Sequence, residues 1–209
     1  MPGESSRIRV DPWLDLSGRG FGLGFSLELG NANWQLQVAR WLGPLVAAAS
    51  LLEGIAAPID QSKVDTDQIL PARFLRRPRK EGYGQFLFKD LMDNPAFVLN
   101  QAPYRAAKIL VADRAFGGGS SREQAPWALS DYGIRCVIAV DFGDIFYLNS
   151  LKSGVLPIVL DACGDLRKQL HARPGATMKV DLPSQTVTGP DGKNYRFEID
   201  AFRKKCLLE

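Results

Sequence analysis

The chain has 209 residues, of which 45% are hydrophobic, so it is long enough for one well-buried domain with an appendage. The formal net charge of +3 is too small to indicate a nucleic-acid partner. We expect no membrane segment either, because the apolar run at residues 41–49 is too short to cross a bilayer and begins too far from Met1 for a standard signal peptide.

The three cysteines, Cys136, Cys163 and Cys206, are widely separated and form no Cys-x-x-Cys pair. This spacing argues against a disulfide framework, a zinc site or a self-contained iron–sulfur cluster. We therefore expect reduced thiols, a cytoplasmic location and no metal or other cofactor bound by this chain. The only histidine, His171, is expected at a surface helix end in a structural or solvated role.

The first patterned segment is the acidic triplet Asp65-Thr66-Asp67. Most such triplets form a helix N-cap or an Asx-turn, and this interpretation stays open here. Further on, the basic cluster at residues 76–80 is typical of a solvated surface loop, with attraction of a dianionic substrate as the alternative. Residues 76–95 form the loop-rich stretch of the chain.

From residue 108 onward, strand and helix patterns alternate. The predicted strands cover residues 108–112, 135–140 and 155–160. The predicted helices cover residues 124–132 and 144–152, with Gly133 and Gly154 near their ends. Strand–helix–strand units of this length imply right-handed parallel crossovers.

The pattern changes toward the C-terminus. Residues 177–182 alternate at period two, and a Pro-Asp-Gly turn signal at residues 190–192 separates two further strand-like runs, 185–188 and 195–199. We expect an antiparallel hairpin that packs against the parallel core. The predicted fold class is α/β, with a parallel sheet core, helices and an antiparallel hairpin layer.

The glycine loop at residues 117–122, Gly-Gly-Gly-Ser-Ser-Arg, is the strongest functional signal in the chain. Consecutive glycines allow positive φ and a close approach of the backbone to a ligand. Free N–H groups at the start of the following helix would converge on whatever lies above Ser120. Arg122 adds a planar fork suited to a carboxylate or a phosphate. The loop therefore predicts an anion held beside a hydroxyl.

A simpler interpretation is a capping box, in which Ser120 caps a helix and Glu123 reaches back to it. Three glycines are unnecessary for a cap, and Pro126 would delete an intrahelical bond if a regular helix began at Ser120. A nest of N–H groups, followed by a helix that starts nearer Gln124, fits better. The loop has neither the Gly-Lys-Ser/Thr of a phosphate loop nor the third glycine of a dinucleotide fingerprint.

Four blocks, in order, carry a resemblance to a known family. They are residues 64–75, the Gly-Ser-Ser-Arg loop with residues 125–129, residues 144–158 and residues 202–208. From about Leu51 onward the chain resembles the small subunit of 3-isopropylmalate dehydratase (isopropylmalate isomerase), the swivel-domain relative of aconitase. The resemblance implies a swivelling β/β/α domain over residues 51–209.

The chain departs from the family pattern at several places. The family loop usually reads Gly-Cys-Gly-Ser-Ser-Arg-Glu-His, and here Gly118 and Gln124 replace the cysteine and the histidine. Asp141 stands where a serine is more usual. Residues 1–50 lie outside the resemblance, and we expect an atypical extension, either from a mis-assigned start or specific to a lineage. Family members usually continue past Glu209, so a truncated tail is expected.

The resemblance also implies an activity, the dehydration and rehydration that isomerise 2-isopropylmalate to 3-isopropylmalate in leucine biosynthesis. It implies that Ser120 is the base, working as an alkoxide. The implied substrate-binding residues are Gly119, Ser121, Arg122 and Arg73, and the implied supporting residues are Asp65, Thr66 and Asp67. Arg73, with Phe74 and Leu75, is expected to border the loop that senses the substrate's γ side chain.

The implied partner is an iron–sulfur large subunit. A 4Fe–4S cluster is expected on that partner, so the chain would be active only in a heterodimer or higher heteromer acting on a small hydroxy-dicarboxylate. Two alternatives stay open. One is a small subunit for another hydroxy acid, such as citramalate, dimethylmalate or homoaconitate. The other is a non-catalytic paralogue, against which the presence of Ser120 and Arg122 argues.

Overall fold

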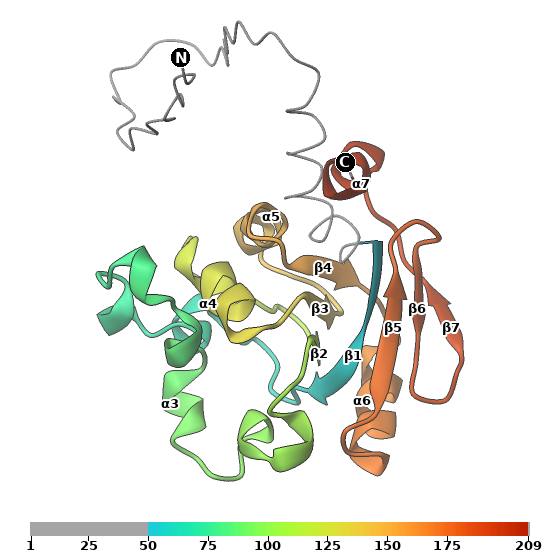
Figure 1. Ribbon diagram of the computed structural model, residues 1–209, viewed down its shortest axis with the longest axis horizontal. Helices are drawn as coiled ribbons and strands as arrows, with labels where there is room; N and C mark the ends of the chain where they lie inside the picture. The colour runs from blue at the N-terminus through green and yellow to red at the C-terminus, as the bar shows by residue number, and fades with distance from the viewer. Residues whose placement is uncertain (1–49, 209) are drawn as a thin grey trace, which may run out of the picture.

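The computed structural model describes residues 50–208, so the apolar run at 41–49 and most of the expected extension lie outside the described part. The described residues form a seven-stranded sheet in the order β4-β3-β2-β1-β5-β6-β7 (Figure 1). The strands are β1 Leu51–Pro58, β2 Ile109–Val111, β3 Cys136–Ala139, β4 Leu156–Val159, β5 Thr177–Asp181, β6 Thr186–Thr188 and β7 Asn194–Arg196. The helices are α2 Thr66–Ile69, α3 Lys89–Met92, α4 Gln124–Tyr132, α5 Asp144–Lys152, α6 Cys163–Ala172 and α7 Ala201–Leu208.

β1 joins the two halves of the sheet. Its last three residues pair in parallel with β2, and its first five pair antiparallel with β5. The predicted parallel core and antiparallel hairpin are both confirmed, and β1 makes them one continuous sheet. No prediction covered β1, because its sequence, Leu-Leu-Glu-Gly-Ile-Ala-Ala-Pro, contains several residues that strands disfavour.

The two helices α4 and α5 begin and end where the pattern predicted. α4 ends at Gly133, whose left-handed φ of 115° lets its N–H close on the carbonyls of Leu129 and Ser130. α5 is followed by Gly154, also at positive φ. Glycine after the last apolar turn is therefore what fixes the C-terminal ends of both helices.

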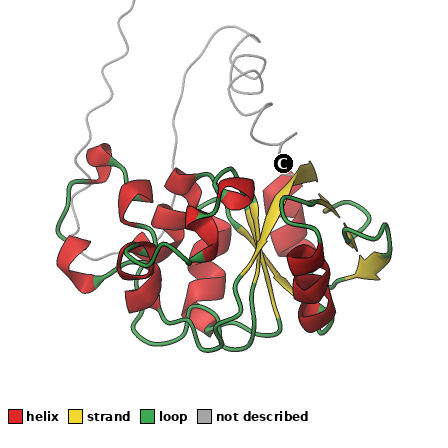
Figure 2. Ribbon diagram, turned by 90° about the horizontal axis from the view of Figure 1, so that it is seen from below, coloured by secondary structure: helices red, strands yellow, loops and turns green. Residues whose placement is uncertain are grey.

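Helices cover both faces of the sheet (Figure 2). On one face, α4 and α5 pack Leu129 and Phe146 against alternate strand residues such as Leu110. On the other face, α6 packs against the residues between them, Ile109 and Val111. This alternation is the period-two geometry of a strand buried on both sides.

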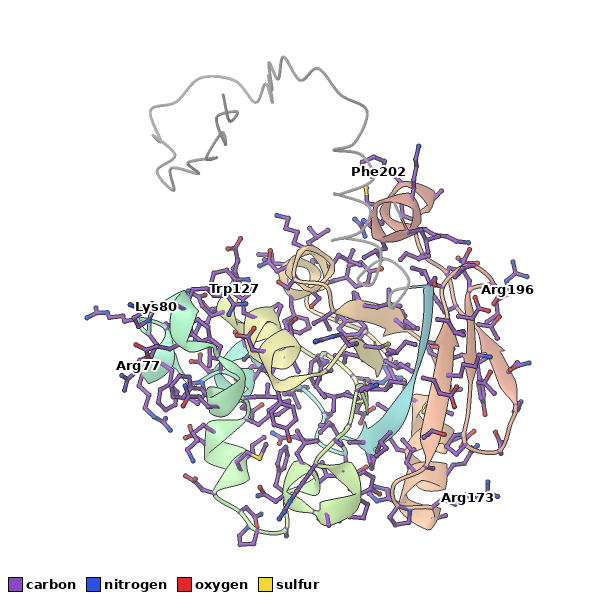
Figure 3. The ribbon with its side chains drawn as sticks, in the orientation of Figure 1. Arg77, Lys80, Trp127, Arg173, Arg196 and Phe202 are labelled. Carbon is purple, nitrogen blue, oxygen red and sulfur yellow. The ribbon has the colours of Figure 1, made fainter. Side chains whose placement is uncertain are left out.

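The loop-rich stretch at residues 76–95 and the residues on either side of it form short helical turns. They run from the 3₁₀ segment Ala72–Phe74 through α3 to the 3₁₀ segment Ala102–Tyr104. The apolar side chains of the stretch, such as Phe88, are fully buried in the core on the α4 face. In the basic cluster, Arg77 and Lys80 reach toward solvent (Figure 3). Arg79 instead pairs with Asp131 of α4, at 2.9 Å from Nη2 to Oδ1. The cluster is therefore a surface segment pinned to the core at one residue.

Within residues 50–208, none of the helices combines the length and the apolar character needed to cross a membrane.

Candidate active site at the glycine loop

The glycine loop leaves the carboxyl end of β2, and the loop before α5 leaves the carboxyl end of β3 beside it. The backbones of the two loops meet in a short bridge between Phe116 and Phe142. Phe116 donates its N–H to the Asp141 carbonyl at 3.1 Å, and Gly143 donates to the Phe116 carbonyl at 3.0 Å. The crevice beyond the carboxyl ends of parallel strands is the usual ligand site of α/β sheets.

Two of the glycines at this junction are required by space. Gly117 has φ of +72°, and a Cβ there would lie 2.1 Å from Cγ of Phe146. A Cβ on Gly143 would lie 2.6 Å from the Gly117 carbonyl oxygen. Gly118 is different, since its nearest contact would be an ordinary 3.5 Å to the Ala115 carbonyl. A Cβ atom would therefore fit at Gly118.

Asp141 holds the turn that leads into the loop. Its Oδ1 accepts a hydrogen bond from the Ala115 N–H at 2.6 Å. Ala115 has φ of 54°, a left-handed conformation that costs energy for a residue with a Cβ. At position 141 this chain therefore has a carboxylate, in place of the more usual serine, that is bonded to the strained residue Ala115, four residues before Gly119.

The segment around Thr66 fixes the other side of the loop. Gly117 donates its N–H to the Val64 carbonyl at 2.7 Å, and Thr66 donates its N–H to the Gly118 carbonyl at 3.0 Å. The Thr66 hydroxyl, which is buried, donates to the Ser120 carbonyl at 2.7 Å. Thr66 therefore orients the peptide that carries Ser120.

The other two residues of the acidic triplet have separate roles. Asp65 is the N-cap of α2 in a capping box: its Oδ1 accepts from the Gln68 N–H at 2.7 Å, and the Gln68 side chain accepts from the Asp65 N–H. The helix-cap interpretation is thus confirmed for Asp65. Asp67 forms a two-point ion pair with Arg122, with 2.9 Å between Nη2 and Oδ2.

The capping-box interpretation is wrong for Ser120. α4 begins at Gln124, and its N-cap, Glu123, makes no side-chain capping bond. Both Ser120 and Ser121 are exposed, and within residues 50–208 neither hydroxyl has a hydrogen-bond partner. The helix starts at Gln124, as predicted, and the loop presents two free hydroxyls just before it.

A cavity of about 190 Å³ lies between the two loops, lined by residues 117–121 and 143–146. The N-terminal end of α5 borders it and carries unsatisfied N–H groups and a partial positive charge, whereas α4 begins at Gln124, three residues beyond the last lining residue of the glycine loop. The N–H groups at the start of α5 suit an anion, while the carboxylate of Asp144 also lines the cavity. The cavity is smaller than complete small-molecule sites, which span roughly 300–1,000 Å³.

The two predicted substrate-binding arginines do not line this cavity. The Arg122 side chain is only 14% exposed and is held by Asp67. Arg73 pairs with Asp90, at 3.1 Å from Nη1 to Oδ2, and lies 4.6 Å above the Phe74 ring. Its hydrogen bond with Asp90 holds the pKa of that carboxyl below its usual value. Arg73 as a substrate ligand stays a prediction.

The cysteines do not fit an iron–sulfur cluster. Cys136 and Cys163 are buried in the core on the α6 face, and burial raises the pKa of both thiols, that of Cys163 to about 12. The Cys163 thiol donates to the Leu160 carbonyl at 2.9 Å, whereas Cys206 is exposed on α7. In the described part of the chain, no group of three His, Cys, Asp or Glu side chains could hold a metal.

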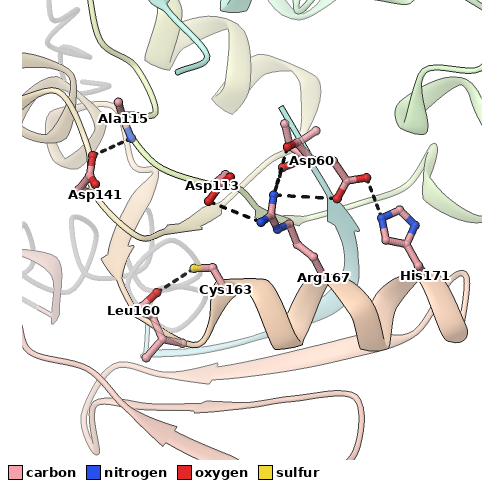
Figure 4. A network of polar contacts seen from close by, with 9 residues as sticks. Asp60, Asp113, Ala115, Asp141, Leu160, Cys163, Arg167 and His171 are labelled. Carbon is pink, nitrogen blue, oxygen red and sulfur yellow. Dashed lines mark hydrogen bonds and ion pairs between the residues drawn. The ribbon is translucent and has the colours of Figure 1, made fainter. Parts of the chain in front are cut away.

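Polar side chains on α6 form a network with the loops that follow β1 and β2, and the sequence did not reveal this network (Figure 4). Arg167 donates to the Ile59 carbonyl at 3.2 Å and lies 3.5 Å from Asp113, so it ties together the loops after β1 and β2. His171 contacts Asp60 at 2.8 Å, which agrees with a structural role at a surface helix end. Residues 143–146 were also missed as cavity residues. Their signal was their place between a strand and a helix, the same place as the glycine loop.

Comparison with known proteins gives consistent matches. The family model described as "Aconitase C-terminal domain" matches residues 47–163, and the one described as "LeuD_N" matches residues 165–201. A 3-isopropylmalate dehydratase small subunit of Xanthobacter autotrophicus is 50% identical over 169 residues, 77% of this chain and 84% of that protein. One from Rhodopseudomonas palustris is 52% identical over 165 residues, 75% and 82% of the two chains.

A solved structure gives the same result. The crystal structure of 3-isopropylmalate dehydratase from Methanocaldococcus jannaschii matches with a TM-score of 0.60 at 27% identity, covering 75% of this chain and 87% of that one. The fold is thus that of an aconitase-type C-terminal domain. Within that class, the chain belongs to the family of 3-isopropylmalate dehydratase small subunits.

Proposed function

We propose that this chain is the small subunit of a two-protein hydro-lyase that converts 2-isopropylmalate into 3-isopropylmalate in leucine biosynthesis. The observation that carries the proposal is the free Ser120 hydroxyl at a cavity bordered by the glycine loop and the N-terminus of α5. The cavity lies in a chain about half identical to small subunits of this enzyme.

Ser120 is assigned the removal of the proton from the carbon next to a substrate carboxylate. No described side chain is hydrogen-bonded to its Oγ, so a neighbouring side-chain base does not activate it. Its proton affinity must instead be lowered by the surrounding dipoles. The N–H groups at the start of α5, which lines the cavity, are suited to stabilise an alkoxide and the charge that develops on the substrate. The same alkoxide, once protonated, returns the proton during rehydration.

Ser121 and Arg122 are assigned to a substrate carboxylate. The guanidinium has five N–H donors, and Asp67 uses two of them through both Nη atoms. The remaining donors include the Nε edge, which offers a second bidentate site. Asp67 therefore orients Arg122 without using all of its N–H donors.

Ile145 and Phe146 supply an apolar wall to the cavity. Such a wall suits an isopropyl group better than a second polar arm, a preference worth roughly 1–3 kcal/mol. In the proposed enzyme the Phe74–Leu75 segment acts at a greater distance, since both side chains pack partly on the core.

Loss of the hydroxyl is assigned to the partner. Two of the three cysteines are buried in the core, so we place the 4Fe–4S cluster on the large subunit. The test uses this chain, the cluster-loaded large subunit and their equimolar mixture, each incubated anaerobically with 2-isopropylmalate. We expect 3-isopropylmalate only from the mixture, and less product from citramalate. Turnover by this chain alone, or none by a verified complex, would overturn the proposal.

A further inference from the structure

The solvent-facing side of α5 carries two large apolar side chains between its charged end residues, Asp144 and Lys152. Ile145 is 51% exposed and Leu148 is 43% exposed, and the two lie about one turn apart. The opposite side of the same helix is buried through Phe146, Asn149 and Ser150. Single exposed apolar residues need no explanation, but two on one helix face beside a ligand cavity do.

This face reaches the cavity at the start of α5, and α7 lies beside α5. Ile145 is itself a cavity-lining residue. The Arg203 guanidinium of α7 lies 5.4 Å from the ring centre of Tyr147, which joins α7 to α5. Next to Arg203, Phe202 is 73% exposed and lies on the outer side of α7, away from the sheet (Figure 3). We name Ile145, Leu148 and Phe202 the α5 rim.

We infer that the α5 rim is the surface on which the large subunit docks, an inference that rests on the proposed function. The cavity is open and smaller than a complete site, and within residues 50–208 no group of three His, Cys, Asp or Glu side chains could hold a metal. A partner that completes the site must close over the cavity's open side. Because Ile145 is both a cavity wall and half exposed, that partner covers Ile145 and the adjacent Leu148.

The chemistry of the rim fits a protein partner. Large aliphatic and aromatic side chains form the centres of protein interfaces, and charged groups lie at their edges. Here Asp144 flanks Ile145 at the cavity end, and Arg203 flanks Phe202 at the other. The expected counterpart on the large subunit is an apolar patch with a basic group near Asp144 and an acidic group near Arg203.

The test introduces one carboxylate at a time and measures the Kd for the cluster-loaded large subunit by titration. Leu148→Glu and Phe202→Glu should each weaken binding by at least about tenfold, because a charge would be buried without a partner. Ala172→Glu is the matched control. It adds the same group at an exposed position of α6, on the other face of the sheet, and should bind within about twofold of wild type.

Melting temperatures of the isolated chains should match wild type, since the replaced side chains are exposed. If Leu148→Glu melts lower, the uncharged Leu148→Gln asks the same question and should still bind several-fold more weakly. Wild-type affinity for both Leu148 variants and for Phe202→Glu would overturn the docking inference alone. Failure of the wild-type chain to bind the large subunit would instead overturn the proposed function.

Discussion

Arg122 and Asp67, which are 55 residues apart in sequence, form a two-point ion pair that joins the glycine loop to α2. The pair fixes the plane of the guanidinium of Arg122, the residue after Ser121, before any substrate is present. A group held in place beforehand loses less conformational freedom when it binds, so the pair is expected to favour substrate binding.

This ion pair can be tested from both sides. Arg122→Lys keeps the charge but loses the fork, so KM should rise markedly in the reconstituted complex, and kcat can fall as well. Asp67→Asn keeps the shape but removes the charge that holds Arg122, so KM should rise by a smaller factor. Steady-state kinetics of both variants check this. A lower KM for Asp67→Asn would show that Asp67 competes with the substrate for the guanidinium.

The loop glycines should differ sharply in their tolerance of a side chain. Gly117→Ala combines a positive φ with a clash against Phe146, and should lower the free energy of unfolding by about 2–4 kcal/mol. Gly118→Ala has room for the new Cβ atom and should stay within about 1 kcal/mol of wild type, and Gly118→Cys tests whether the larger side chain is accepted as well. Denaturant unfolding measures all three. Equal losses at both positions would contradict the geometry of the loop.

Asp141 should stabilise the turn at Ala115 through one hydrogen bond. Asp141→Ala removes the acceptor and should lower the free energy of unfolding by about 1 kcal/mol, with faster hydrogen exchange at the Ala115 amide. Asp141→Asn retains an oxygen acceptor and is the control. If exchange at Ala115 is unchanged in Asp141→Ala, the carboxylate does not hold the turn.

The buried thiols predict a loss of stability at high pH. The pKa of Cys163 is raised by burial from 9.0 to about 12, so the folded protein keeps this proton where the unfolded chain releases it. Its contribution to stability is therefore complete below pH 9 and is lost as the pH rises toward 12. The checks are denaturant unfolding between pH 8 and pH 10 and thiol labelling of the folded protein at pH 8. Labelling should reach Cys206 first. Rapid labelling of Cys163 would show that solvent reaches this thiol and would contradict its burial.

The parts of the fold that could be predicted are those encoded by neighbours in sequence. α4 and α5 were predicted to the residue because a clear pattern ends near a glycine in each case. β1 could not be predicted, since its Gly, Ala and Pro residues become a strand only through pairing with both β2 and β5. α7 was also missed. It has no buried residue, and only Leu207 and Leu208 pack partly against the core, so its apolar side chains do not mark a packed face in the sequence.

The same limit applies to the site. Ser120 and Arg122 could be singled out because glycines, hydroxyls and a guanidinium are adjacent in sequence. The pairing of Arg122 with Asp67 and the cavity wall from α5 depend on tertiary contacts, and no local pattern encodes them. Arg73 is a further example, because its pairing with Asp90 could not be predicted from their spacing in the sequence.

The most direct test of the account is the turnover of Ser120→Ala in the reconstituted complex. The hydroxyl is exposed and has no partner among the described residues, so the variant should melt like wild type and bind the large subunit with the same affinity. Without the proton acceptor, kcat should fall by a factor of about 10³ or more, with a modest change in KM. Near wild-type turnover by this variant would contradict the assignment of Ser120 and, with it, the central claim about the loop.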